Sequence, residues 1–194
     1  MSETSASLPT RTVDGVEVPL PGTYALDVAH SHVGFMVRHM MVAKVRGRFT
    51  AFSGAVVVAD DLASSTVEVE IDTASIDTRD ETRDGHLRSP DFLDAEQYPT
   101  ITFVTTGVTP VGGTEYTVHG DLTVHGVTRP VDLDVTYEGI AQDPWGNHRL
   151  GFTATTEIDR EDFGLSWNQA LETGGVLVGK AVKIEIEAEA VRQG

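Results

Sequence analysis

A two-residue alternation of apolar and polar side chains runs through most of the chain and constrains the fold more than any other feature. Successive side chains of a β-strand point to opposite faces, so such a stretch predicts a strand with one apolar and one polar face. One polar face is typical of antiparallel sheets. The alternating stretches are residues 33–39, 66–72, 116–125, 131–138, 150–158 and 182–190.

Turn signals separate these stretches and indicate how the strands connect. They lie at Gly112-Gly113, at Gly126, at residues 144–147 and at Gly174-Gly175. Short strands joined by such turns are typical of a barrel or a sandwich. A closed barrel removes the exposed edges that an open sheet must protect. We therefore predict an all-β fold, a single antiparallel β-barrel of about eight strands.

Residues 78–98 break the alternation and are rich in charge. We expect a short helix near 79–88, ended by Ser89-Pro90, and a second turn near 91–95. This helical segment, near 79–95, is expected to close one end of the barrel.

The 194 residues show no break in composition that would demand two domains. Residues 1–22 are rich in Ser, Thr and Pro, which predicts a polar, loosely attached N-terminal arm. The alternating Val16, Val18 and Leu20 favour docking of part of this arm as an edge strand. Residues 23–194 are then the barrel domain.

Composition excludes several kinds of chemistry and partner. The chain has no cysteine, which excludes disulfides, thiolate metal sites and a cysteine nucleophile. Its 30 acidic and 14 basic residues give a net charge of −16, so no nucleic-acid partner is expected. Anionic membrane surfaces should repel it over about 8 Å at physiological salt. No signal-peptide core or membrane-spanning run is present, so we expect a cytoplasmic protein without stable membrane insertion.

The predicted inner faces carry Phe, Val, Leu and Ile. A barrel of about eight strands either fills itself with side chains or holds one small ligand. The pattern alone leaves the packed and the hollow barrel at about even odds.

Ordered motifs across residues 23–190 favour the hollow barrel, because they resemble the YceI-like family of polyisoprenoid-binding, lipocalin-like proteins. The motifs are Tyr24-Ala25-Leu26-Asp27, residues 30–39, Gly47-Arg48-Phe49, Gly54, Ile76-Asp77-Thr78, residues 83–89, Asp91-Phe92-Leu93-Asp94, residues 98–103, residues 120–131 and residues 158–165.

The resemblance implies a lipocalin-like barrel, closed at one end, with an elongated tunnel for an isoprenoid or another amphiphilic chain. It also implies a bacterial protein, and relatives suggest a homodimer. Many relatives carry a signal peptide, and we expect none here.

Strand parity and the resemblance together select the candidate ligand-binding residues, for which ordinary core packing is the alternative role. Phe49 is the least certain, because a bulge at Ala51-Phe52-Ser53 would turn it to the other face. The candidates are Phe35, Val37, His39, Phe49, Val69, Ile71, Phe103, Leu122, Val124, Phe152, Leu165 and Trp167.

Two groups of polar residues suggest other sites. His30 and His32, with Asp27 or His39, suggest a metal, but the spacing fixes no third ligand, so we predict none. Arg83, Asp84 and His86 suggest a catalytic or head-group site, although ion pairs of Asp80 and Asp84 with Arg83 and Arg88 on a helix surface are favoured.

We therefore predict a non-catalytic protein that binds, sequesters or transports a polyisoprenoid or similar amphiphile and needs no cofactor. The alternatives are an isomerase- or cyclase-type enzyme acting on a lipid-like substrate in the same cavity, and a packed barrel acting through its acidic surface. His39 and His86 are the candidate acid/base residues of the enzyme. We also expect Phe163-Gly164-Leu165-Ser166-Trp167 to run along the barrel as a strand, with its three large side chains on one face.

Overall fold

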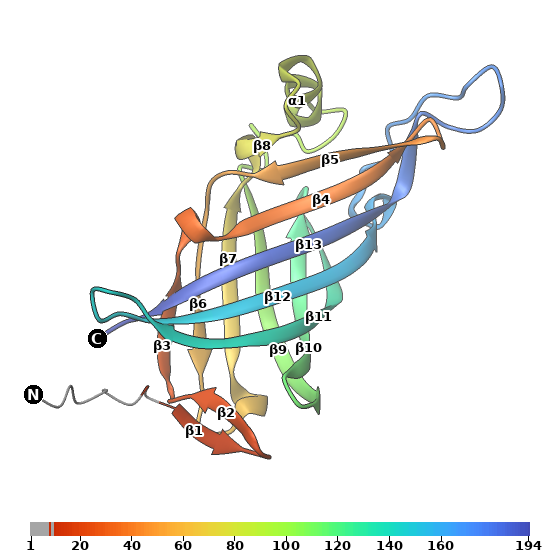
Figure 1. Ribbon diagram of the computed structural model, residues 1–194. Helices are drawn as coiled ribbons and strands as arrows, with labels where there is room; N and C mark the ends of the chain where they lie inside the picture. The colour runs from red at the N-terminus through yellow and green to blue at the C-terminus, as the bar shows by residue number, and fades with distance from the viewer. Residues whose placement is uncertain (1–7, 9) are drawn as a thin grey trace, which may run out of the picture.

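The computed structural model describes residue 8 and residues 10–194, and its centre is a closed antiparallel barrel of eight strands (Figure 1). Each strand pairs with the next, and β13 pairs with both β12 and β3 to close the ring. In order around the ring the strands are β3 (Gly22–Leu26), β6 (Phe52–Val58), β7 (Thr66–Asp72), β9 (Thr100–Gly112), β10 (Glu115–Val124), β11 (Val127–Gln142), β12 (His148–Asp159) and β13 (Val178–Arg192).

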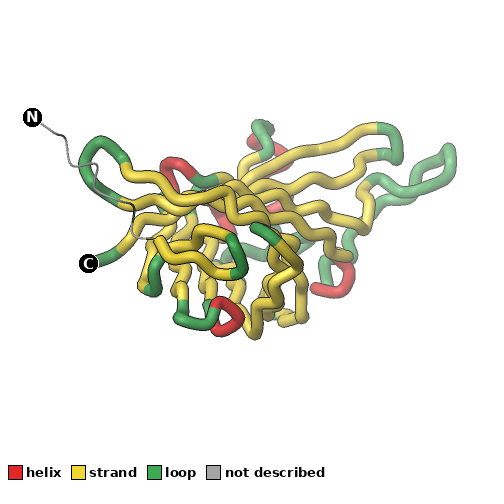
Figure 2. The backbone as a smooth tube through the Cα atoms, turned by 60° about the horizontal axis from the view of Figure 1, so that its bottom comes forward, coloured by secondary structure: helices red, strands yellow, loops and turns green. Residues whose placement is uncertain are grey.

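The long strand β13 serves two neighbours on one edge. Its residues 190–192 pair with β3, and its residues 178–187 pair with β4 (His32–His39). β4 then pairs with β5 (Ala43–Phe49), and the last residues of β5 pair with β8 (Ile76–Asp77). The β4–β5 hairpin, residues 32–49, therefore extends the sheet beyond the closed ring (Figures 1 and 2).

The predicted alternation is confirmed, since the six stretches lie in strands β4, β7, β10, β11, β12 and β13, except that β10 ends one residue before His125. The alternation of residue types does not predict β9, although the side chains at its start alternate between buried and more exposed positions. Ile101 and Phe103 are buried, but the outward Val104 is 45% exposed and hides the pattern. Register shifts between β9 and β10 also displace its partners.

The predicted helix forms as α1 (Glu81–Arg88), capped by Asp80 and ended at Ser89 before Pro90. The predicted surface ion pairs are wrong, because Arg83 and Asp84 both bind Thr78. The buried carboxylate of Asp84 accepts hydrogen bonds from the Thr78 amide at 2.9 Å and from its hydroxyl. Arg83 donates to the Thr78 hydroxyl at 2.7 Å and to its carbonyl at 2.8 Å.

Within the described residues, four short 3₁₀ turns connect the strands, and an aspartate caps each one by accepting a backbone N–H two residues later. The turns are η1 (Val28–His30), η2 (Leu62–Ser64), η3 (Thr73–Ser75) and η4 (Arg160–Phe163), with caps Asp27, Asp61, Asp72 and Asp159.

Residues 10–19 fold as a separate hairpin of β1 (Thr10–Val13) and β2 (Val16–Pro19) at one end of the barrel (Figure 1). The two strands pair with each other, so the expected edge strand on the barrel does not form. Val18 is nevertheless only 2% exposed. Residues 1–7 and 9 of the predicted arm lie outside the described residues, and the division into arm and barrel domain stays a prediction.

Two buried clusters occupy different parts of the barrel. The floor cluster, near the β1–β2 hairpin, consists of Tyr24, Val56, Val58, Tyr137, Leu150 and Ala190. The wall cluster consists of Ile76, Leu93, Ile101, Phe103, Val118, Leu122, Val124, Phe163 and Leu165. No helix in the described part of the chain is long and apolar enough to cross a membrane.

Candidate ligand-binding cavity

The barrel is hollow. A cavity of about 800 Å³ runs through it, with a lining that is almost wholly apolar. This volume corresponds to about 27 water molecules at about 30 Å³ each. Protein interiors are normally packed with few voids larger than one water molecule, so a space of this size and chemistry indicates a binding site for an apolar molecule.

All twelve residues selected from the sequence line this cavity. A bulge at Ala51-Phe52-Ser53 would have turned Phe49 outward. Phe49 faces inward, because β5 ends at Phe49 and the irregular backbone follows it. Its ring lies 5.8 Å from that of Phe35, measured between centroids. Lining is a property of the fold, and contact of these residues with a ligand stays a prediction.

Many inward side chains are only half-buried, which distinguishes a hollow barrel from a packed one. Phe35, Val37, Ile71 and Phe152 all point inward yet keep part of their surface accessible. The sequence does not predict this partial accessibility. Alternation shows which face of the strand a side chain is on, but not how far away the opposite wall of the barrel lies.

The floor of the cavity carries tyrosines that the sequence did not single out. Tyr116 and Tyr137 line it, and the neighbouring Tyr24 donates its hydroxyl to the Leu20 carbonyl at 2.8 Å. The buried Tyr137 hydroxyl has no hydrogen-bond partner among the described residues. Burial raises the pKa of Tyr137 to about 12 and raises that of Tyr116, so both phenols are neutral at physiological pH.

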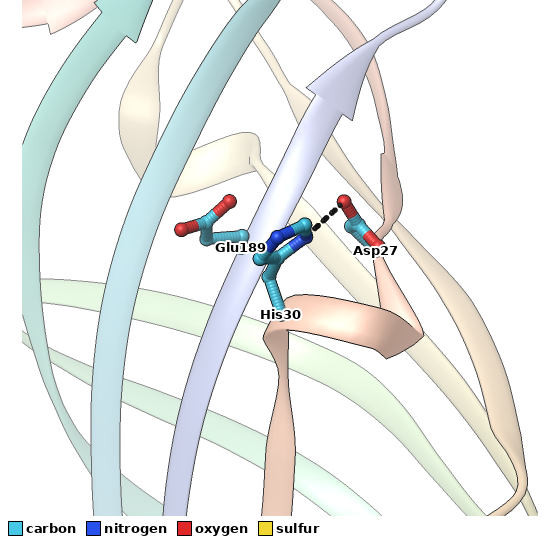
Figure 3. Close-up of side chains that lie close together, drawn as sticks. All are labelled: Asp27, His30 and Glu189. Carbon is cyan, nitrogen blue, oxygen red and sulfur yellow. Dashed lines mark hydrogen bonds and ion pairs between the residues drawn. The ribbon is translucent and has the colours of Figure 1, made fainter. Parts of the chain in front are cut away.

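Outside the cavity, Asp27, His30 and Glu189 place their ligand atoms within 4.8 Å of one another (Figure 3). His30 Nδ1 lies 2.8 Å from Asp27 Oδ2. Arg149 donates to Asp27 and Glu189 and also to Asp143. Its hydrogen bond, together with that of His30, lowers the pKa of Asp27 to about 2.

A guanidinium thus already supplies positive charge where a metal ion would have to bind. Neither His32 nor His39 belongs to this group of residues. The absence of a metal requirement stays a prediction.

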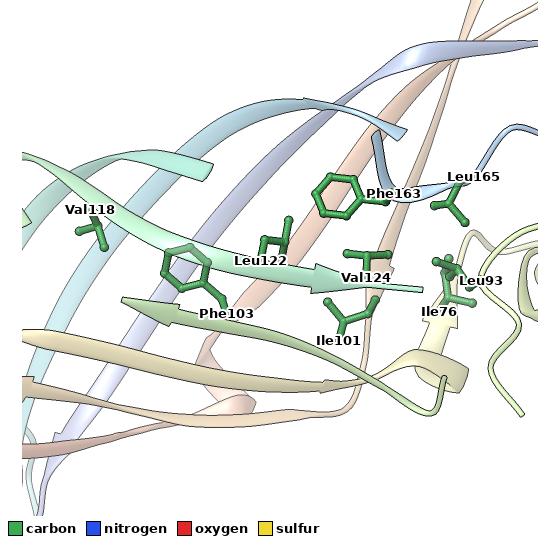
Figure 4. Packing of buried hydrophobic residues seen from close by; sticks show 9 residues of the cluster. All are labelled: Ile76, Leu93, Ile101, Phe103, Val118, Leu122, Val124, Phe163 and Leu165. Carbon is green, nitrogen blue, oxygen red and sulfur yellow. The ribbon is translucent and has the colours of Figure 1, made fainter. Parts of the chain in front are cut away.

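At the opposite end, the segment after β12 folds over the wall of the barrel (Figure 4). The predicted strand over residues 163–167 is wrong. η4 ends at Phe163, and Gly164 turns the chain with a left-handed φ of 76°. Phe163, Leu165 and Trp167 still line the cavity, because the turned segment lies across the barrel end.

Arg160 holds this turned segment in place. The side chain is 3% exposed and donates to the backbone carbonyls of Leu165, Val178 and Gly179. Burial lowers the pKa of this guanidinium. The arginine therefore ties the segment to the start of β13.

An aromatic group joins α1 to the same segment. His86 lies edge-on to Phe92 and Trp167, at centroid distances of 5.0 and 4.7 Å. Its Nε2 lies 2.9 Å from an Asp91 carboxylate oxygen. Both His86 and Trp167 line the cavity, so the group covers part of this end, and the helical segment closes it only partly.

The cavity is not sealed at the α1 end. The exposed Asp80 and Thr82, at the start of α1, contribute to its lining together with Arg83. Arg38 and His39, at the end of β4, also line it. Polar groups therefore surround this end, whereas the middle of the cavity is hydrocarbon.

Comparison with known proteins agrees with this geometry. The sequence matches the family model of the YceI-like domain over residues 24–190. The UPF0312 protein SAS2572 of Staphylococcus aureus is 41% identical over 168 residues, which cover 86% of this chain and 95% of that protein.

Solved structures show the same fold. BcnA of Burkholderia cenocepacia superposes with a TM-score of 0.73 at 29% identity, covering 85% of this chain and 99% of BcnA. A polyisoprenoid binding domain from Saccharophagus degradans superposes with a TM-score of 0.69 at 18% identity, covering 88% and 98%. The match begins within β3 and ends within β13, so it covers nearly the whole barrel, and the chain belongs to the YceI-like family.

Proposed function

We propose that this protein is a non-catalytic binding protein for a polyisoprenoid or a similar long-chain amphiphile. The observation that carries the proposal is the hollow apolar cavity of about 800 Å³. Apolar surface removed from water contributes about 25 cal/mol per Å². A long hydrocarbon chain in this cavity would therefore bind through burial, with few hydrogen bonds.

The distribution of polar groups favours an amphiphile over a pure hydrocarbon. Asp80, Thr82 and Arg83 lie at the open α1 end of the lining, where the polar end of a ligand would remain in contact with water. The similar domain of Saccharophagus degradans is a polyisoprenoid binding domain, which supports the same ligand class.

The physiological use of such binding follows from the poor solubility of the ligand. We propose sequestration or transport of the amphiphile in the cytoplasm, by a protein that acts alone or as a homodimer. A lipid-converting enzyme in the same cavity is the competing function, with His39 and His86 as its candidate acid/base residues.

Native mass spectrometry of the purified protein, followed by solvent extraction, tests the proposal directly. We expect a copurifying long-chain lipid, and we expect an added isoprenoid to change the fluorescence of Trp167, which lines the cavity. Absence of both would overturn the proposal, and chemical conversion of the added isoprenoid would support the enzyme instead.

A matched pair of variants ties binding to the cavity. Val69 on β7 lines it, whereas its neighbour Glu70 is exposed on the outer face. We expect Val69→Phe to fill the cavity and weaken isoprenoid binding about tenfold, equivalent to about 1.4 kcal/mol. Glu70→Phe should bind like the wild type. Equal binding by both variants would place the ligand elsewhere.

A further inference from the structure

The tip of the β4–β5 hairpin exposes three consecutive large apolar residues. Met40, Met41 and Val42 are 43%, 57% and 83% exposed. The described residues include five other exposed large hydrophobics, which do not form such a run: Val28, Val57, Val104, Val111 and Trp145. A contiguous exposed apolar patch marks an interaction surface more often than a scattered residue does.

The turn at this tip is built from residues that disfavour its backbone. Met40 and Met41 have φ values of 50° and 62°, in the left-handed region that glycine and asparagine favour. Two other hairpins use sequences better suited to the same turn, with Asp14-Gly15 at 50° and 82° and His125-Gly126 at 54° and 71°. Folding would favour such residues here too, so the two methionines indicate a role other than folding.

The hairpin is also basic within a strongly acidic protein. Residues 28–59 contain none of the 30 acidic residues of the chain and four of its 14 basic ones. Arg38, Lys44 and Arg46 are exposed and form no ion pair within the described part of the chain. Arg38 lies directly opposite Lys44 in the strand register, an arrangement of like charges that destabilises a sheet unless an anion offsets it.

This apolar tip adjoins the cavity. His39, Val45 and Leu177 line the cavity, and the Met40 amide donates to the Leu177 carbonyl at 2.8 Å. Figure 1 shows the hairpin tip beside the segment that precedes β13. A surface that engages the tip would therefore lie next to the polar end of the cavity.

We propose that the tip of the β4–β5 hairpin docks the protein on an anionic lipid bilayer. Met40, Met41 and Val42 enter the interfacial layer, while Arg38, Lys44 and Arg46 contact lipid phosphates. The apolar tip favours a bilayer over nucleic acid, whose backbone binds through charge. The acidic remainder of the protein repels an anionic bilayer, but salt screens this repulsion beyond about 8 Å at physiological ionic strength. The charges nearest the bilayer therefore dominate the interaction.

Docking on a bilayer is a property beyond ligand binding in the cavity, and it supplies a route by which the ligand reaches the cavity. A long-chain amphiphile could pass between the bilayer and the cavity without crossing water. The two proposals can fail separately, because the tip residues Met40, Met41 and Val42 do not line the cavity.

Vesicle flotation tests the docking. The probes are phosphatidylcholine vesicles with and without about 30% phosphatidylglycerol, at about 0.15 M and about 0.5 M salt. We expect the wild type to float with anionic vesicles at the lower salt and to be released at the higher salt. Equal recovery with neutral vesicles, or no recovery with anionic ones, would overturn the proposal.

The variant Met40→Asn/Met41→Gly removes two of the three apolar tip residues and introduces the sequence that this turn prefers. We expect an unchanged or higher melting temperature, loss of flotation, and unchanged isoprenoid binding by Trp167 fluorescence. Trp145→Ser, which removes an 82% exposed side chain on another loop, is the matched control and should float normally.

The triple variant Arg38→Gln/Lys44→Gln/Arg46→Gln should lose about fivefold in vesicle affinity for each charge removed. Flotation of the methionine double variant at wild-type levels would overturn the proposal. Dimerisation of the wild type through the tip, without vesicle binding, would also overturn it and would assign the surface to self-association.

Discussion

The two ends of the barrel use similar apolar side chains in different ways. At the floor, Leu150 is 1% exposed and Tyr24 and Ala190 are fully buried, so this end is a packed core. Toward the α1 end, the inward Val37 and Phe35 remain half-buried around the cavity. The floor residues are enclosed by other side chains, whereas a half-buried inward residue faces empty space that a ligand can occupy. The difference teaches that the inner face of one barrel can be both core and site.

The sharpest test of this contrast compares two truncations. We expect Leu150→Ala at the floor to lower the free energy of unfolding by about 2–5 kcal/mol, because it creates a new void. Val37→Ala should lower it by about 1 kcal/mol or less, since its side chain already faces empty space. Urea denaturation of both variants measures the difference. Equal losses would show that the cavity end is packed as tightly as the floor.

The second test concerns the polar contacts that hold α1 over the open end. Asp84 is 3% exposed and accepts two hydrogen bonds from Thr78. Asp84→Ala should lower the free energy of unfolding by about 1–3 kcal/mol, because it leaves the Thr78 amide unpaired. Asp91→Ala, which removes an exposed carboxylate at the same end, is the control and should have a smaller effect. Thermal melts distinguish the two variants.

The third test uses pH at the floor end. The pKa of Asp27 is about 2 in the folded protein, below its ordinary value of 3.8. A carboxyl whose pKa is lowered by folding stabilises the protein above its ordinary pKa, and this stabilisation is lost as pH falls from about 4 to about 2. Asp143, with a pKa of about 2, acts in the same direction.

The urea midpoint of the wild type should therefore fall between pH 5 and pH 2.5. In Arg149→Met the fall should be smaller, because Arg149 hydrogen-bonds to both carboxylates. An equally steep fall in the variant would show that other carboxylates cause the acid sensitivity.

The smallest expected effect is at the Tyr137 hydroxyl, which is buried without a partner among the described residues. Tyr137→Phe should change the free energy of unfolding by less than about 1 kcal/mol, because no hydrogen bond is lost. In a spectrophotometric titration of the wild type, this phenol should ionise near its raised pKa of about 12. A large destabilisation would reveal a hidden partner, such as a bound water or ligand atom.

Local pattern was sufficient to predict six of the strands, β4, β7, β10, β11, β12 and β13, and much of the cavity lining. Val69 and Ile71 alternate with Glu68 and Glu70, and a period of two gives such residues one shared face in any sheet. Ser89-Pro90 likewise marked the C-terminal end of α1, whereas the capping role of Asp80 came from the structure. The resemblance to the YceI-like family added the expectation that the inner face surrounds a tunnel.

Long-range contacts decided what the pattern could not. Whether Val37 meets another side chain or empty space depends on the barrel circumference, which is set by the pairing of β13 with β12 on one edge and with β3 and β4 on the other. Arg160 and the left-handed Gly164 turned the predicted strand at 163–167 into a cover across the barrel end. Sequence thus determined which way each strand residue faces, because that depends on the local backbone period. Only the tertiary structure determined how far the opposite wall stands, because that distance is set by residues far apart in the chain.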